Sequence, residues 1–160
     1  INMEKNLLFV RIDDRLIHGQ VMTSWMKIMP AKQIIVVDNK VAKDDFMLFV
    51  LQNAAPKGVK VIALTEDDAI TKVKEGLKVP TFILAKTPLS LKPLVDAGLD
   101  INEINVGGMG MKQGREKLYK NISASEEERE CFKYFDEKGI RVYIQIVATA
   151  AAIDVNGLLK

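Results

Sequence analysis

Apolar and polar positions form blocks along the chain that predict strands separated by helices. Short apolar runs predict strands, and several are apolar throughout, as expected for strands buried on both faces of a parallel sheet. The predicted strands cover residues 7–12, 33–38, 59–64, 79–85, 101–106 and 140–147, with a weaker segment at 118–122. Strands that alternate with helices in this way indicate βαβ units.

The predicted helices have recognisable start and stop signals. Proline or glycine ends most of them, and Thr65, Thr87 and Ser125 are predicted N-caps, the last in a capping box. The predicted helices cover residues 18–29, 44–55, 66–75, 88–97 and 126–138. We therefore expect one α/β domain over residues 3–160, an open and mainly parallel sheet with helices on both faces. Residues 1–2, which precede Met3, are expected to lie outside the domain.

Composition and charge exclude several classes of protein. The chain has 160 residues, 23 basic and 21 acidic, for a net charge of +2. This near-neutral balance provides no basic stripe for nucleic acid or an anionic membrane surface. No apolar run approaches the roughly 18–20 residues of a membrane span. Length and composition are those of one globular domain.

Cysteine and histidine occur once each, at Cys131 and His18. A single cysteine forms no internal disulfide, and one cysteine with one histidine does not fill a tetrahedral zinc site. Because the N-terminus also lacks a signal-peptide pattern, we expect a cytoplasmic protein. No metal and no cofactor are expected.

The loop that follows the first predicted strand concentrates reactive side chains. It contains Asp13, Asp14, Arg15, His18 and Gly19. His18 lies at a predicted helix N-terminus, which favours an anion, and the arginine fork matches phosphate. An adjacent acid could fix the imidazole tautomer, and Gly19 lets a ligand approach the backbone. These residues predict a histidine that accepts a phosphoryl group.

A structural interpretation of the same loop stays open at this point. Asp13 or Asp14 could cap the following helix, with Arg15 paired to the capping acid. In that case the polar residues would only start a helix, and His18 would be an exposed side chain.

A second candidate loop follows the fifth predicted strand and contains Gly107, Gly108 and Met109. Adjacent glycines can present backbone N–H groups to an anion, although a tight turn explains them equally well. Their spacing fits neither a dinucleotide-binding nor a P-loop motif. Met109 and Met111 would suit a surface that meets protein partners.

Three segments carry a resemblance to a known family. The run from Val10 to Val21 (VRIDDRLIHGQV) resembles the phosphorylation loop of the IIB components of bacterial phosphoenolpyruvate-dependent sugar phosphotransferase systems, mannose/sorbose family. Residues 105–109 and 143–149 resemble that family's second loop and closing strand. The resemblance spans nearly the whole chain, and the first motif is the specific one.

The resemblance implies a role for each matched residue. His18 corresponds to the phosphohistidine and Arg15 to the phosphate-orienting arginine, while Asp13 and Asp14 match the motif without separate roles. The implied partners are a IIA phosphodonor, the membrane components IIC and IID, and a sugar. The chain departs from the family pattern at Gly110 and Ala148, outside the phosphorylation loop. The sugar and the oligomeric state, a homo-oligomer included, stay open.

A signalling receiver domain is the alternative. It would use Asp13 and Asp14 after the first strand and Lys86 after a later one. A receiver also needs an acceptor aspartate at the end of the third strand, where this chain has Leu64 and Thr65. It has no use for His18.

Overall fold

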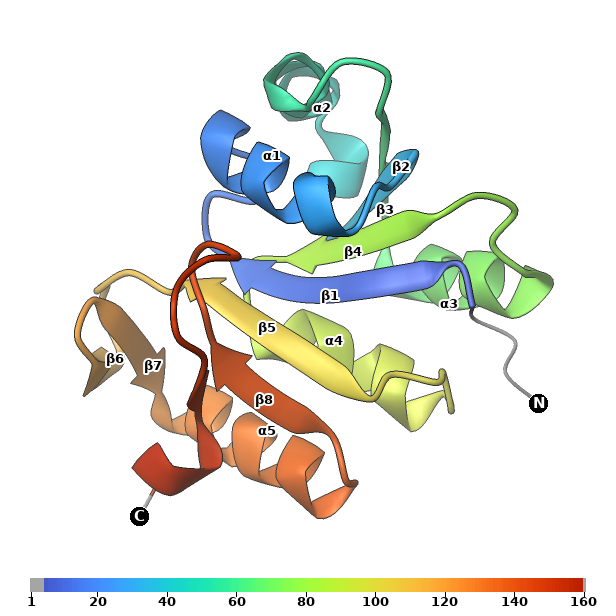
Figure 1. The fold of residues 1–160 in the computed structure, drawn as a ribbon. Coiled ribbons are helices and arrows are strands. Elements are labelled where there is room, and N and C mark those ends of the chain that lie inside the picture. The colour runs from blue at the N-terminus through green and yellow to red at the C-terminus, as the bar shows by residue number, and fades with distance from the viewer. Residues whose placement is uncertain (1–4, 160) are drawn as a thin grey trace.

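The computed structural model describes residues 5–159, which form an open seven-stranded sheet flanked by helices (Figure 1). The strand order is β3-β2-β4-β1-β5-β8-β9, and every pairing is parallel except the one between β8 and β9. The strands are β1 (Leu7–Asp13), β2 (Gln33–Val37), β3 (Lys60–Leu64), β4 (Thr81–Ala85), β5 (Glu103–Gly108), β8 (Arg141–Ile144) and β9 (Ile153–Asp154). The expected α/β class is confirmed. The expected domain start at Met3 lies outside the described residues.

The helices cover both faces of the sheet, as the sequence predicts. They are α1 (Gly19–Ile28), α2 (Asp45–Ala54), α3 (Glu66–Glu75), α4 (Pro88–Asp96) and α5 (Glu126–Glu137), with short 3-10 helices at Val41–Lys43 and Asn156–Leu158. One core layer joins α1 and α2 to the sheet, and the other joins α3, α4 and α5 to the opposite face. Phe9 faces the first layer and Val10 the second, because successive strand residues point to opposite faces.

Side-chain caps fix where several helices begin. Thr65 accepts a hydrogen bond from the backbone N–H of Asp68, and Thr87 accepts one from that of Leu89. Ser125 forms the predicted capping box with Glu128. These caps satisfy backbone N–H groups that have no partner within their helix.

The structure differs from the sequence prediction in its last third. The weak segment at 118–122 is part of an antiparallel hairpin, β6 (Arg115–Tyr119) and β7 (Ile122–Ser125), which forms a separate two-stranded sheet. The predicted strand 140–147 ends at Ile144, and the chain returns after a loop as β9. The sequence did not predict β6, β7 and β9 as separate strands because these segments have no strong apolar pattern. They are strands because of the segments with which they pair.

The sheet topology changes direction beside β1. From β1 the chain crosses through α1 to β2, whereas the neighbouring β5 leads through α5 to β8 on the other side. Adjacent parallel strands whose connections leave in opposite directions open a crevice at their carboxyl ends. The loop that contains His18 begins there.

Candidate active site around His18

His18 lies at the start of α1, behind a turn that is anchored in the core. It is the N-cap residue, with an extended backbone, and its side chain is 23% exposed. Leu16 and Ile17 before it are buried. Leu16 adopts a φ of 59°, a left-handed conformation that costs a leucine roughly 1–2 kcal/mol. Packing must hold this strained turn, so the position of the imidazole is well determined.

Asp13, the last residue of β1, fixes the protonation pattern of that imidazole. Its side chain is fully buried, and its Oδ2 lies 2.7 Å from Nε2 of His18. An ionised carboxylate only accepts hydrogen bonds, so Nε2 of the neutral ring must be the protonated nitrogen. Nδ1 therefore keeps its lone pair, as a nucleophile requires.

Next to Asp13 lies a buried arginine for which the sequence alone predicts no role. Arg11 is fully buried, and its Nη2 lies 3.0 Å from Oδ2 of Asp13. Its Nη1 donates to Oδ1 of Asn105 at 2.7 Å and to the carbonyl of Gln145 at 3.3 Å. The available signal was an arginine inside an apolar predicted strand. The contacts of Asn105 and Gln145 depend on the strand order, which the sequence does not display.

These neighbours keep Asp13 ionised. Burial alone would raise the pKa of Asp13, but hydrogen bonds from His18 and from the backbone N–H of Arg15, together with the charge of Arg11, lower that pKa below its ordinary value. A buried carboxylate that stays charged can stabilise an imidazolium as it forms.

Gly107 and Gly108 have a different role from the predicted one. They end β5, and they provide space for the polar side chains of β1. A Cβ on Gly107 would lie 2.0 Å from Cζ of Arg11, and a Cβ on Gly108 would lie 2.6 Å from Oδ1 of Asp13. The expectation of an anion-binding or tight-turn loop is corrected accordingly: the close approach is made by the protein's own side chains.

Asp14 and Arg15 face different surroundings. The side chain of Arg15 is 63% exposed and its Nε lies 3.7 Å from Oδ1 of Asp13, so the guanidinium can move to a ligand. Asp14 accepts hydrogen bonds from the backbone N–H of Gly110 and from Arg115. With these partners Asp14 supports the loop, and the expectation that Asp13, Asp14, Arg15 and Gly19 bind or orient the phosphoryl group stays a prediction. Neither acid caps α1, so the capped-helix interpretation is wrong.

The two methionines of the second loop differ in their exposure to solvent. Met109 is fully buried in the core, so the expectation that it meets a partner is wrong. Met111 is 65% exposed and is available on the surface.

Gly19 starts α1, and an added Cβ there would meet nothing within 4 Å. A ligand can therefore approach the first N–H groups of the helix, which have no acceptor within it.

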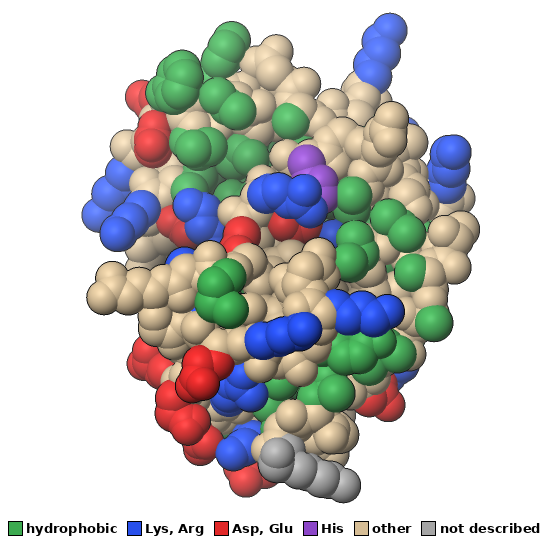
Figure 2. All heavy atoms as spheres, turned by 90° about the vertical axis from the view of Figure 1, so that its left-hand side faces the viewer, with side chains coloured by type: hydrophobic (Ala, Val, Ile, Leu, Met, Phe, Trp, Pro, Cys, Tyr) green, Lys and Arg blue, Asp and Glu red, His purple; other side chains and the backbone are tan. Residues whose placement is uncertain are grey.

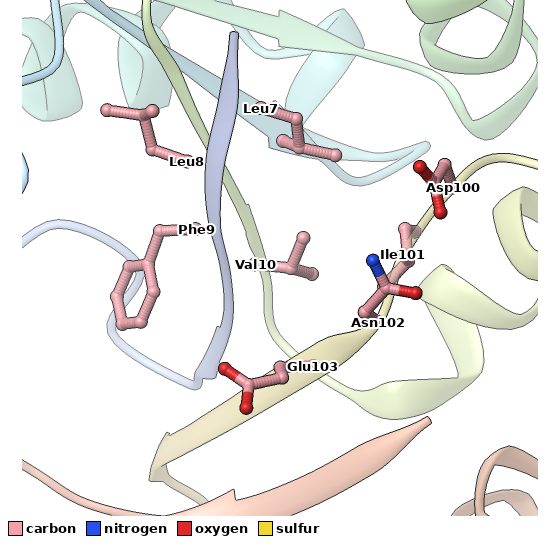
Figure 3. A pocket seen from close by; sticks show the side chains of 8 residues that line it. All are labelled: Leu7, Leu8, Phe9, Val10, Asp100, Ile101, Asn102 and Glu103. Atoms are coloured by element: carbon pink, nitrogen blue, oxygen red, sulfur yellow. The ribbon is translucent and has the colours of Figure 1, made fainter. Parts of the chain in front are cut away.

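Figure 2 looks onto the carboxyl ends of the strands and shows the imidazole at the surface, beside basic side chains and between hydrophobic patches. A hollow at the opposite ends of β1 and β5 has a different lining (Figure 3). Its charged side chains are Asp100 and Glu103, so an anion would be repelled there. The reactive groups thus gather at the carboxyl ends.

The described residues contain neither a metal-binding cluster nor a membrane-spanning helix. Within residues 5–159, no three His, Cys, Asp or Glu side chains are grouped so that they could hold a metal ion. None of the helices in that range is both long and apolar enough to cross a bilayer. The acid pair proposed for a receiver is divided between two networks, with Asp13 already bound to Arg11 and His18.

Comparisons with known proteins identify the family of the chain. The family model described as "PTS system sorbose subfamily IIB component" matches residues 7–160. The fructose-specific EIIB component of Bacillus subtilis is 30% identical, over 97% of this chain and 96% of that protein. The mannose-specific EIIAB component of Escherichia coli is 33% identical over 94% of this chain, which spans 47% of that longer relative.

Among solved structures, the IIBSor domain of the sorbose permease from Klebsiella pneumoniae superposes with a TM-score of 0.90. The sequences are 30% identical, and the match covers 96% of this chain and 95% of that one. These likenesses give no support to the receiver alternative. The chain therefore belongs to the sorbose-subfamily IIB components of the sugar phosphotransferase system, transferases that relay a phosphoryl group during sugar uptake.

Proposed function

We propose that His18 is the residue of this chain that carries the phosphoryl group, and that Nδ1 is the atom that binds it. The supporting observation is the 2.7 Å contact between Nε2 of His18 and Oδ2 of Asp13 in a partly exposed imidazole. It assigns the proton to Nε2 and leaves Nδ1 free to attack.

The first transfer is an in-line exchange between two nitrogen atoms. Nδ1 of His18 forms a bond to phosphorus while the bond from phosphorus to a phosphohistidine nitrogen of the IIA donor breaks, and the donor ring recovers its electron pair. The ring of His18 gains positive charge, which the ionised Asp13 stabilises. Arg15 and the backbone at Gly19 hold the phosphoryl oxygens.

The second transfer passes the group to a sugar. A sugar hydroxyl presented by the membrane components IIC and IID attacks phosphorus and loses its proton, while the P–N bond breaks and Nδ1 recovers its lone pair. The protein would act at the cytoplasmic side of the membrane. Because the relatives named above belong to fructose, mannose and sorbose systems, we expect the choice of sugar to lie outside this domain.

Both partners must reach the same imidazole, so we expect a shared docking surface around the His18 loop. Met111, which is 65% exposed, suits such a surface because methionine adapts to different partners. Chemical-shift mapping with the IIA partner should place the contact on this face. A contact on the β3 edge of the sheet would contradict it.

The chemistry of the phosphorylated protein tests the proposal. A phosphohistidine loses its group in acid, because protonation of the ring assists P–N cleavage, and survives alkali. A phosphoaspartate is an acyl phosphate and is destroyed by hydroxide. We expect acid-labile, alkali-stable label, acquired from a phosphorylated IIA donor in excess chelator and absent from a folded His18→Gln protein. Label on His18→Gln, or label lost in mild base, would contradict the proposal.

A further inference from the structure

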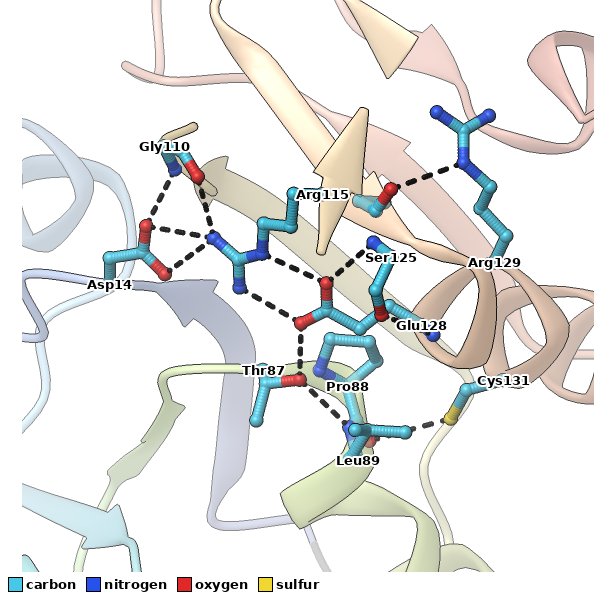
Figure 4. Close-up of polar contacts among 11 residues, drawn as sticks. Asp14, Thr87, Pro88, Leu89, Gly110, Arg115, Ser125, Glu128, Arg129 and Cys131 are labelled. Atoms are coloured by element: carbon cyan, nitrogen blue, oxygen red, sulfur yellow. Dashed lines mark hydrogen bonds and ion pairs between the residues drawn. The ribbon is translucent and has the colours of Figure 1, made fainter. Parts of the chain in front are cut away.

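A second buried arginine, Arg115 on β6, reaches the loop of His18 through Asp14 (Figure 4). Its side chain is 1% exposed. Nε and Nη2 donate to Oε1 and Oε2 of Glu128 at 2.9 and 2.8 Å. Nη1 lies 3.2 and 3.1 Å from the two carboxylate oxygens of Asp14 and donates to the carbonyl of Gly110 at 2.9 Å. One guanidinium thus joins two carboxylates from distant parts of the chain.

Glu128 is itself held in place, so it provides a fixed support for Arg115. The backbone N–H of Ser125 donates to its Oε1 at 2.9 Å, and the hydroxyl of Thr87 donates to its Oε2 at 2.7 Å (Figure 4). Burial alone would raise the pKa of Glu128, but Arg115, Ser125 and Thr87 lower it below its ordinary value. The starts of α4 and α5 therefore determine where the guanidinium lies.

Asp14 connects this support to the turn that carries His18. Its backbone N–H donates to the carbonyl of Gly108 at 2.9 Å, and its carboxylate accepts from the N–H of Gly110. Two residues later, Leu16 occupies the left-handed conformation, which persists only where the surroundings hold it. Asp13 is anchored by Arg11 on one side of the turn, and Asp14 by Arg115 on the other.

We propose that Arg115 is a positioning residue for phosphoryl transfer: by binding Asp14, it holds the turn so that His18 faces the incoming phosphorus. Glu128 fixes Arg115, and neither residue touches the phosphoryl group. The inference rests on the proposed role of His18. Since in-line transfer depends on the placement of the nucleophile, loss of this hold lowers the rate at saturating donor and leaves donor binding largely intact.

The hairpin offers a matched control for the test. Arg129 on α5 donates to the backbone carbonyls of Ala124, Glu116 and Lys117, so it also stabilises β6 and β7. It makes no contact with Asp14 among these hydrogen bonds. Arg115→Lys and Arg129→Lys are the same chemical change on the same substructure, and both keep the charge. The buried Glu128 is not left without a cation in Arg115→Lys, which favours a folded protein.

Single-turnover transfer from phosphorylated IIA to the full chain is measured over a range of donor concentrations. We expect Arg115→Lys to lower the maximal rate about tenfold, with little change in the half-saturating donor concentration, and Arg129→Lys to change neither. If Arg115 acts through Asp14, the double variant Asp14→Asn/Arg115→Lys is no slower than the slower single variant. Wild-type rates in Arg115→Lys, an equal loss in Arg129→Lys, or multiplied losses in the double variant would overturn the proposal.

A second measurement does not depend on transfer at all. The backbone amide of Gly110 donates to Asp14, so its NMR shift and hydrogen exchange report whether the anchor is intact. We expect both to change in Arg115→Lys and not in Arg129→Lys; an unchanged Gly110 amide in Arg115→Lys would overturn the positioning role. Failure of the wild-type protein to take label on His18 would instead count against the proposed function.

Discussion

Two buried arginines support the two neighbouring acids of the His18 loop. They differ in how far they lie from their acid in the sequence and in what the bound carboxylates contact. Arg11 lies two residues before Asp13 on the same strand, and the carboxylate that it binds also contacts the imidazole. Arg115 lies 101 residues from Asp14, and the carboxylates that it joins contact backbone and hydroxyl groups. We refer to these as the Arg11 network and the Arg115 network.

The difference shows how identical neighbours come to serve different purposes. Asp13 is fully buried and its side chain contacts the imidazole of His18, whereas the side chain of Asp14 is 33% exposed and connects two loops. Adjacent residues at a strand end point to opposite sides, so one acid meets Arg11 and His18 and the other meets Arg115 on the hairpin. In the mechanism that we propose, the Arg11 network serves the chemistry and the Arg115 network serves the placement of the loop.

The largest effect is expected from Asp13→Asn. The amide removes the negative charge and can donate to Nε2, which would move the ring proton to Nδ1. We expect transfer to fall by roughly 10³–10⁴-fold, the scale seen when a catalytic histidine is held in the wrong tautomer. Single-turnover labelling measures the rate. Asp14→Asn is the matched variant, and an equal loss there would remove the distinction between the two networks.

Gly107→Ala tests the space that the Arg11 network requires. The new Cβ would lie 2.0 Å from Cζ of Arg11, a buried group with little freedom to move. We expect the free energy of unfolding to fall by about 3 kcal/mol, through overpacking and a disturbed ion pair. Urea unfolding provides the measurement. Gly19→Ala is the control, since its Cβ meets nothing within 4 Å and the expected change is within about 0.5 kcal/mol.

Arg15→Lys separates phosphate binding from loop structure. Lysine keeps the charge but loses the planar fork that can bind two phosphoryl oxygens. Because the Arg15 side chain is 63% exposed, we expect a stability change within about 0.5 kcal/mol and a transfer rate lowered about tenfold. Equal transfer rates for Arg15→Lys and wild type would mean that Arg15 only pairs with Asp13.

The smallest effect concerns stability in acid. The pKa values of Asp13 and Glu128 are both lowered in the folded protein, by hydrogen bonds and adjacent arginines that outweigh burial. A lowered folded pKa contributes stability that is present above the unfolded carboxyl pKa of about 4 and is lost as pH falls through the folded value.

Urea unfolding at several pH values measures this linkage. We expect the free energy of unfolding of the wild type to decrease as pH falls below about 4, and the decrease to be shallower in Glu128→Gln, which has one shifted carboxyl fewer. Asp13→Asn should behave in the same way. A decrease as steep as that of the wild type in both variants would mean that these carboxyls do not drive acid unfolding.

The fold could be predicted from the sequence wherever a pattern is local. The capping box at Ser125, the N-cap at Thr87 and the apolar strand that became β4 each depend on a few consecutive residues. The hairpin of β6 and β7 was not predicted, because its strands are defined by pairing with each other. The order of the strands in the sheet could not be predicted from local patterns either.

In the site, too, local groupings of residues could be predicted from the sequence and contacts between distant segments could not. The sequence places His18, Arg15 and the two acids in one loop, since they lie within six residues of one another, but it does not show which acid contacts the imidazole. Sequence reasoning missed Arg11, Arg115 and Glu128 and misread Gly107 and Met109. Each of these residues acquires its role from a partner on another element: Gly107 from the arginine beside it on β1, and Met109 from its burial in the core.

Two contacts also bear on how the site forms during biosynthesis. The carbonyl of Gln145 accepts a hydrogen bond from Arg11, 134 residues earlier, and the carbonyl of Ile146 accepts one from the indole N–H of Trp25, 121 residues earlier. A chain still on the ribosome that ends before β8 lacks both acceptors, along with the strand that covers Asn105. Translation therefore makes the His18 loop before the backbone carbonyls that complete its support. The support of Arg11 and Trp25 is thus completed only by the segment that follows β8, however early the His18 loop itself is made.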